Sequence, residues 1–194
     1  SEVEVIADES ANPAFIAADF LSQAEHGVDS QAMLVTASES IVEPVMQAIR
    51  EQLDRLPRKE ITEKSLSHSR LIVLKDKQEV IDFTNLYAPE HLIIQTTDYA
   101  DIAGQVENAG SVFMGPYTPE SAGDYASGTN HTLPTNGYAK AYSGVNLDSF
   151  IKKITFQEIT ADGIRLLGGT IRTMAANEQL DAHRNAVTIR LNTI

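Results

Sequence analysis

The chain has 194 residues, and its 15 Lys and Arg residues against 27 Asp and Glu residues give a formal net charge of −12. This acidic balance, without a basic run, argues against a nucleic-acid partner, because phosphate binding needs clustered Lys and Arg. The absence of Cys excludes disulfides, thiolate catalysis and Cys-ligated zinc. No stretch approaches the about 18 apolar residues of a membrane span, so we expect no membrane partner and a cytoplasmic location.

Short apolar segments and amphipathic segments alternate over the first two thirds of the chain. The sequence predicts strands over residues 3–7, 32–36, 71–74, 91–94 and 111–114. It predicts helices over residues 13–26, 40–53, 78–87 and 99–107. This alternation is typical of an α/β fold, in which a parallel sheet is covered by helices on both faces.

The alternation of strand-like and helix-like segments ends after residue 114. Residues 115–137 are rich in Gly and Pro, and a loop of this length is usually functional. We expect a domain over residues 1–145 and a small, mostly helical C-terminal lobe over residues 146–194. Within the lobe, the sequence predicts a short helix over 148–153, a strand at 155–156, a helix over 161–178 and a last strand over 186–191. Because the chain opens with Ser1 rather than Met, we also expect a processed or truncated protein.

Polar residues at the end of the first predicted helix form one candidate site. Gln23 and His26 are three positions apart, so their side chains project from the same helix face and could supply two ligands. The alternative is an ordinary helix end, at which the helix dipole favours a His.

Glu90 and His91 form a second candidate, directly before an apolar strand. An adjacent carboxylate and imidazole can move protons near neutral pH. A charged pair at a turn is the alternative.

The long loop is the third candidate, since it contains Asp124 and His131. It lacks the glycine spacing of a phosphate-binding loop or of a dinucleotide-binding turn, so a lid or a carboxylate ligand is the functional interpretation. Glu178 and His183 follow near the end of the chain, where a solvated helix end is the alternative. A sulfur-free set of N and O ligands suits catalytic Zn²⁺, and the candidates for it are Gln23, His26, Asp124 and His183.

Five segments resemble motifs of the histidinol dehydrogenase family, in the family's order. They are LSQAEHG at 21–27, YAPEHL at 87–92, GSVF at 110–113, PESAGDYASGTNHTLPT at 119–135 and AHRNAV at 182–187. The resemblance covers essentially the whole chain and implies Rossmann-like domains. The family is about twice as long, so the resemblance implies the C-terminal half of the enzyme, without its N-terminal half.

The resemblance implies an NAD-dependent zinc enzyme of histidine biosynthesis, which oxidises L-histidinol to L-histidine by two successive hydride transfers. Glu90 and His91 would then be catalytic, with His91 as general base and Glu90 activating water. The zinc ligands would be Gln23, His26, Asp124 and His183. The substrate-binding residues would be Ser1, Gln23, His26, His91, Asp124, His131, Glu178 and His183.

The resemblance also implies a homodimer with a shared active site, in which the small lobe crosses to the partner subunit. NAD would be bound mainly by the absent N-terminal half, so no residue of this chain is assigned to it, and the chain alone is expected to be inactive. Two alternatives stay open. One is a non-catalytic binding or interaction domain with a decayed site, and the other is a zinc-assisted hydrolase in which Glu90 activates a water.

Overall fold

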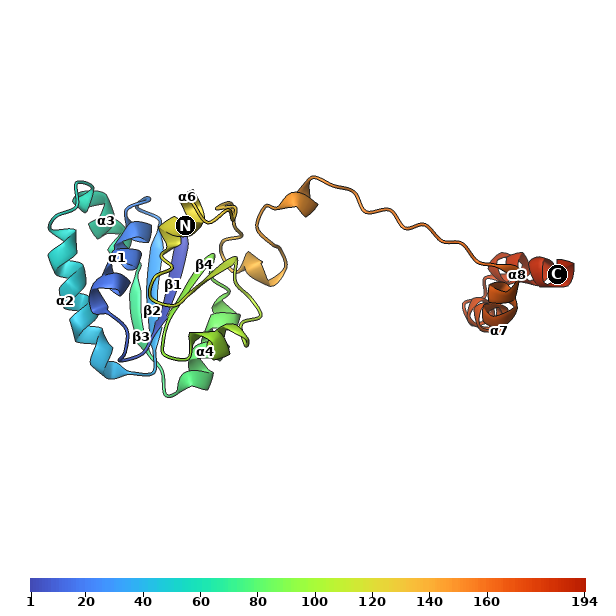
Figure 1. Cartoon of the computed structure of the whole chain (residues 1–194), viewed down its shortest axis with the longest axis horizontal. Helices are drawn as coiled ribbons and strands as arrows, with labels where there is room; N and C mark the ends of the chain where they lie inside the picture. The colour runs from blue at the N-terminus through green and yellow to red at the C-terminus, as the bar shows by residue number, and fades with distance from the viewer. The chain divides into compact units, whose positions relative to one another are not determined.

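The computed structural model describes all 194 residues, which divide into two compact units, Ser1–Phe150 and Ile151–Ile194. The first unit is a sheet flanked by helices, and the second is a pair of helices (Figure 1). None of the helices combines the length and the apolar character needed to cross a membrane.

The first unit contains a five-stranded sheet in the order β3-β2-β1-β4-β5, and all neighbouring strands are parallel. The strands are β1 (Glu2–Ala7), β2 (Gln31–Thr36), β3 (Arg70–Val73), β4 (His91–Gln95) and β5 (Ser111–Met114). The helices are α1 (Pro13–Ala24), α2 (Val42–Leu53), α3 (Lys59–Leu66), α4 (Lys77–Tyr87), α5 (Tyr99–Ala103) and α6 (Glu120–Tyr125). The predicted α/β fold with a parallel sheet is therefore confirmed.

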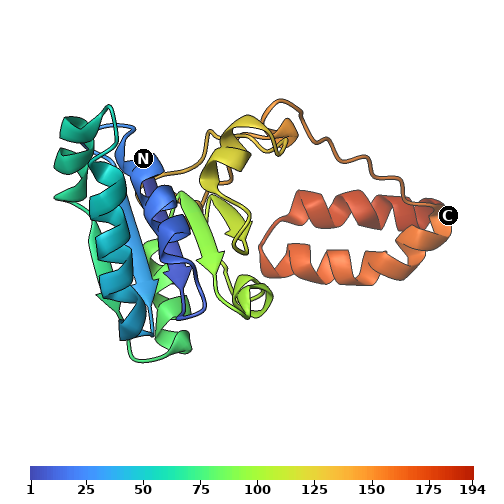
Figure 2. The same cartoon turned by 60° about the vertical axis from the view of Figure 1, so that its left-hand side comes forward.

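Helices cover both faces of the sheet because each strand alternates its side chains between the two faces. Val3 and Val5 of β1 pack in a cluster with Phe20 of α1 and Val45 of α2. On the opposite face, a second cluster joins β1 to α4 and α5 through Ile6, Val80 and Ile102. Figures 1 and 2 show α1 and α2 on one side of the sheet and α4 on the other.

The first helix has the predicted start. The Asn12 side chain accepts a hydrogen bond from the Ala14 backbone N–H at 2.9 Å, and Pro13 occupies the first helical position, where its missing N–H costs nothing. Because α1 returns between two parallel strands, its last turn lies near the amino ends of β1 and β2. This direction brings Gln23 to the start of the sheet.

Several predicted elements are wrong. The segment 186–191, predicted as a strand, lies within α8 (Asp181–Thr193), which pairs with α7 (Ala161–Asn177). Its β-branched residues favour a strand locally, but packing of Val187 close to Gly168 of α7 overrides that preference. The predicted helix over 148–153 is only a 3₁₀ turn at Leu147–Ser149, and residues 151–160 contain no regular element, so the strand at 155–156 is absent. Helices α3 and α6 were not predicted, and α6 lies within residues 115–137, which were expected to be a loop.

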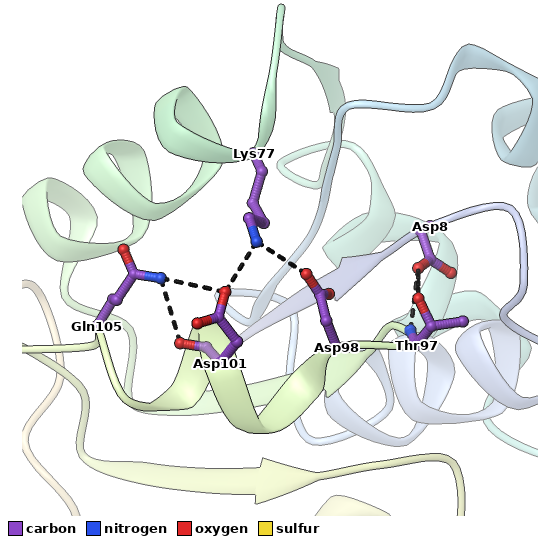
Figure 3. A network of polar contacts seen from close by, with 6 residues as sticks. All are labelled: Asp8, Lys77, Thr97, Asp98, Asp101 and Gln105. Carbon is purple, nitrogen blue, oxygen red and sulfur yellow. Dashed lines mark hydrogen bonds and ion pairs between the residues drawn. The ribbon is translucent and has the colours of Figure 1, made fainter.

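A network of ion pairs and hydrogen bonds lies at the carboxyl end of the sheet (Figure 3). Lys77 Nζ lies 2.9 Å from Asp98 Oδ2 and 2.8 Å from Asp101 Oδ2, which links the start of α4 to α5. Asp8, just after β1, accepts hydrogen bonds from the backbone N–H and the hydroxyl of Thr97 at 3.0 and 3.2 Å. The positive charge of Lys77 is therefore neutralised by Asp98 and Asp101.

Glu4 is a carboxyl group in the middle of the core. It lies on the central strand with no exposed surface, and burial raises its pKa to about 8. The Thr84 hydroxyl contacts both Glu4 Oε1 and the Val80 carbonyl, but it has a single proton. When that proton goes to Val80, the contact with Glu4 needs a proton on the carboxyl group. The effect of burial exceeds that of the Thr84 hydrogen bond, which lowers the pKa, so Glu4 is mostly neutral at pH 7.

We expect Glu4→Gln to stabilise the protein increasingly as the pH rises from 5 to 8. The pKa of Glu4 is about 8 in the folded state against 4.5 for the free group. The free energy of unfolding therefore falls as the pH rises over this interval. The neutral amide of Gln adds no such pH dependence. Since one pKa unit corresponds to about 1.4 kcal/mol, the gain at pH 8 should be on the order of several kcal/mol. Urea unfolding at pH 5, 6.5 and 8 measures it, with the exposed Glu9→Gln as control. A gain that does not change with pH would contradict a neutral buried Glu4.

We expect Gly110→Ala to destabilise the protein by about 1–3 kcal/mol, the usual cost of overpacking. A Cβ at residue 110 would lie 2.5 Å from the backbone carbonyl oxygen of Glu90 and 3.1 Å from Leu133 Cβ. The control is Gly104→Ala, whose Cβ would meet backbone oxygens at ordinary distances of 3.5 and 3.6 Å. Equal urea midpoints for the two variants would show that the close approach at Gly110 is relieved without cost.

Candidate active site

The candidate site lies at the amino ends of β1 and β4. The parallel register places Val3 opposite His91, which brings the start of the chain beside Glu90. The Ser1 hydroxyl donates a hydrogen bond to Glu90 Oε2 at 2.6 Å, and the Glu2 backbone N–H donates to the same oxygen at 3.0 Å. Glu90 is only 6% exposed. Its carboxylate is therefore held in one place by two donors.

His91 has one bound and one free ring nitrogen. Its Nδ1 lies 3.1 Å from the Glu2 backbone carbonyl oxygen, which can only accept a hydrogen bond. In the neutral ring, Nδ1 therefore carries the proton, and Nε2 keeps its lone pair. His91 Nε2 is buried and has no hydrogen-bond partner. This arrangement leaves a proton acceptor ready for a group that enters the site.

Gln23 joins the last turn of α1 to this cluster. Its side chain is completely buried. The orientation of the amide that satisfies both ends has the nitrogen donating to Glu120 Oε1 and Oε2 at 3.1 and 3.3 Å. The amide oxygen then lies 3.0 Å from the Ser1 hydroxyl, which can donate its one proton either to this oxygen or to Glu90 Oε2. One residue thus contacts α6 on one side and the start of β1 on the other.

Three side chains could hold a metal ion. The ligand atoms of His26, Glu120 and Asp124 all lie within 4.8 Å of one another. His26 follows α1, whereas Glu120 and Asp124 are one turn apart on α6 and share a face. Nitrogen and oxygen donors without sulfur suit Zn²⁺ in a catalytic setting. The donor set therefore fits the metal that the sequence indicates.

Glu120 is the residue that sequence reasoning missed. It is 2% exposed, and its pKa is raised to about 8 by burial and by the negative charges of Asp124 and Glu90. His91 Nδ1 lies 3.8 Å from Glu120 Oε1 and equally far from Glu90 Oε2. The sequence signal that could have indicated Glu120 is its spacing, since it lies four residues, or about one helical turn, before Asp124.

The structure brings together six of the predicted site residues, which are Ser1, Gln23, His26, Glu90, His91 and Asp124. His131 lies exposed on the loop after α6. Glu178 and His183 belong to the second unit, where both are exposed. The first unit by itself therefore offers three of the four predicted metal ligands.

The turn after β1 lacks the features of a dinucleotide-binding turn. The turn after β1 reads Asp-Glu-Ser-Ala-Asn-Pro at residues 8–13, without a glycine and with two acidic residues. Pyrophosphate binding at such a turn needs glycines that let the backbone approach the phosphates. The nearest cation, Lys77, is paired with Asp98 and Asp101. No NAD-binding residue is assigned in this chain.

Comparisons with known proteins show the family of the chain. The family model described as histidinol dehydrogenase matches residues 1–191. A histidinol dehydrogenase of Bacteroides fragilis is 68% identical over 194 residues, which are all of this chain and 45% of that protein. The chloroplastic histidinol dehydrogenase of Arabidopsis thaliana is 57% identical over 195 residues, which cover all of this chain and 42% of that protein.

A solved structure gives the same result. The crystal structure of histidinol dehydrogenase from Elizabethkingia anophelis matches with a TM-score of 0.94 and 56% sequence identity, over all of this chain and 45% of that chain. The chain thus spans less than half the length of these relatives. Because the family model matches nearly every residue, the chain belongs to the histidinol dehydrogenase family.

Proposed function

We propose that this chain is the part of a histidinol dehydrogenase that carries the metal ligands and the acid–base groups. In this proposal, the whole protein oxidises L-histidinol to L-histidine in the cytoplasm, using two NAD and one water. The observation that carries the proposal is the buried His91 ring, whose Nε2 has no partner and whose Nδ1 lies 3.8 Å from both Glu90 Oε2 and Glu120 Oε1. Family membership does not favour the decayed binding domain or the hydrolase.

The metal would be held by Gln23, His26 and Asp124, with His183 as fourth ligand. When bound, Zn²⁺ would hold and orient the substrate through its imidazole and amine, which is the positioning role of a metal. Glu178 and His131 are proposed to bind the substrate as well. Because Glu178 and His183 lie in the second unit, we propose that they complete the site of a partner subunit in a homodimer.

His91 is proposed to act as the general base. The hydrogen bond from Nδ1 to the Glu2 carbonyl fixes the tautomer, so the lone pair on Nε2 accepts the proton of the substrate hydroxyl when its carbon is oxidised. The imidazolium that forms lies near two carboxylates, Glu90 and Glu120, each 3.8 Å from Nδ1. Negative charge on Glu90 would stabilise it, whereas Glu120, with a pKa of about 8, is mostly neutral at pH 7.

Glu90 is proposed to serve the second oxidation. An aldehyde-level intermediate must gain a water before it can lose a second hydride, and a carboxylate can take the proton of that water. Ser1 and the Glu2 backbone hold Glu90 Oε2, so Oε1 is the oxygen that would take this proton. Burial of Glu90 keeps other water away from the reacting carbon.

We expect His91→Asn, in the longer protein that contains this chain, to lower kcat by about 10²- to 10⁴-fold, the usual contribution of a general base. The Asn amide can still donate to the Glu2 carbonyl, but it cannot take a proton. Formation of NADH from L-histidinol over a range of pH measures the effect, and the limb of the profile that reports the base should disappear. His68→Asn is the matched control, because His68 is exposed and is not among the predicted site residues. Activity of His91→Asn equal to that of the control would exclude His91 as the base.

We expect about one zinc ion per chain in the 194-residue protein after gentle desalting, as for a four-ligand site. Elemental analysis measures the content, and sedimentation shows whether the protein is a dimer. Asp124→Asn should lose zinc, whereas Asp29→Asn, at an exposed position, should retain it. A chain that retains no zinc and binds none on addition would contradict the assembly of the metal site from this chain's residues.

A further inference from the structure

The backbone of Glu2 holds both proposed catalytic groups. Its N–H donates to Glu90 Oε2 at 3.0 Å, and its carbonyl oxygen lies 3.1 Å from His91 Nδ1. Glu2 is the first residue of β1, and the ends of such elements open more easily than their middles because fewer contacts hold them. The positions of Glu90 and His91 therefore depend on what keeps this end of β1 in place.

The side chain of Glu2 is a carboxyl group that the proposed mechanism does not use. It belongs to a residue that is only 7% exposed, and a carboxylate this deeply buried is costly unless other groups bind it. The Tyr87 hydroxyl lies 2.7 Å from Glu2 Oε2, and the Asn136 backbone N–H donates to Glu2 Oε1. Each oxygen thus has a partner from a different segment, one from the end of α4 and one from the loop after α6.

The Tyr87 hydroxyl has one proton and two neighbouring oxygens. Besides Glu2 Oε2, it lies 2.8 Å from Gln31 Oε1, and the Gln31 amide nitrogen donates to the His68 carbonyl at 3.0 Å. Burial and the hydrogen bond to Glu2 raise the pKa of Tyr87, so the hydroxyl keeps its proton. Because an ionised carboxylate is a stronger acceptor than an amide oxygen, this proton goes to Glu2.

The Asn136 N–H belongs to a tight turn that ends the loop. Asn136 and Gly137 both have positive φ, of 55° and 73°, and the Tyr138 N–H donates to the Thr135 carbonyl at 3.1 Å. These are the features of a type I′ turn, in which Asn followed by Gly is preferred. A Cβ at residue 137 would lie 3.5 Å from the last carbonyl of α4, so the turn packs against the end of this helix. The start of β1 is therefore tied to a turn of defined geometry.

We infer that Glu2 is a positioning residue, whose side chain fixes the peptide groups that hold Glu90 and His91; this rests on the proposed function. The side chain is bound by Tyr87 and Asn136, and the backbone of the same residue binds the catalytic pair. Glu2 acts through Glu90 and His91 and exchanges no proton in the reaction.

The first test compares E2A with E2Q in the longer protein that contains this chain. E2A removes both side-chain contacts, and a misplacement of about 1 Å can cost about 100-fold in rate, so we expect kcat for L-histidinol to fall by about that factor. The amide of E2Q can accept from the Asn136 N–H and donate to the Tyr87 oxygen, whose proton then goes to Gln31. We therefore expect E2Q to stay close to the wild type. If E2Q is as slow as E2A, the charge of Glu2 takes part in the reaction and the inference is wrong.

The matched control is D8A, at the opposite end of β1. Asp8 also accepts hydrogen bonds from a backbone N–H and from a hydroxyl, those of Thr97, at 3.0 and 3.2 Å. D8A therefore removes the same kinds of contact from the same strand, away from the site, and we expect its kcat to equal that of the wild type. Equal kcat values for E2A and D8A would contradict the inference.

The pH profile separates positioning from proton transfer. Loss of a positioning residue lowers kcat but leaves in place the limb of the profile that reports the base, whereas His91→Asn removes this limb. We also expect E2A to change KM less than kcat, because the groups it displaces act in the transition state. Loss of the limb in E2A would identify Glu2 as a titrating group of the reaction and would overturn its role as a positioning residue.

The tautomer of His91 gives a readout that needs no activity. Nitrogen chemical shifts of the imidazole rings, measured by NMR on the 194-residue chain, report which nitrogen carries the proton, and His91→Asn identifies the signal. We expect the Nδ1–H tautomer in the wild type and in E2Q, and a mixture of tautomers in E2A, because the Glu2 carbonyl then no longer stays beside Nδ1. A pure Nδ1–H tautomer in E2A would contradict the inference and leave the proposed function intact. An inactive longer protein with the expected tautomers would instead overturn the proposed function, and with it the part of Glu2 in the reaction.

Discussion

The site depends on the pairing of β1 with β4. These strands are neighbours in the sheet although most of the first unit separates them in sequence, and their register places Val3 opposite His91. That single alignment allows the Ser1 hydroxyl and the Glu2 backbone to hold Glu90, and the Glu2 carbonyl to bind His91. A shift of one residue would turn His91 to the other face of the sheet, away from α1.

The location of the site at the amino ends of the strands is unusual for an open parallel sheet. Ligands of such sheets generally bind outside the carboxyl ends, where the strand order reverses. In this chain, the carboxyl end is occupied by Asp8, Lys77 and the carboxylates that neutralise it. The helix that returns between β1 and β2 delivers Gln23 to the opposite end, where α6 adds Glu120 and Asp124. The proposed acid–base and metal-ligand groups therefore lie at the end of the sheet opposite the one where ligands of open parallel sheets generally bind.

Much of the fold and the chemical types of the site could be predicted from the sequence. Four strands contain continuous apolar runs, and β1 contains one that only Glu4 interrupts; such runs are clear in a sheet that is covered on both faces. The segment 186–191 was misread because Val187, Thr188 and Ile189 favour a strand locally, whereas contacts within the helix pair decide its structure. Helix α3 was not predicted because its sequence, KEITEKSL, is mostly polar and has few apolar residues at helical spacing. The position of Glu120 beside His26 and Asp124 could not be predicted, since it depends on a short helix, α6, within a segment expected to be a loop.

The buried Glu4 also links the folding of the protein to the protons of its solvent. At pH 7, Glu4 is neutral in the core, because its pKa there is about 8, but the free carboxyl group has a pKa of 4.5 and is ionised. Each molecule that unfolds at this pH must therefore release the proton that Glu4 carried, and the buffer must take it up. The heat absorbed on unfolding will then include the protonation heat of the buffer, so calorimetry in phosphate and in an amine buffer will give different enthalpies for the same transition.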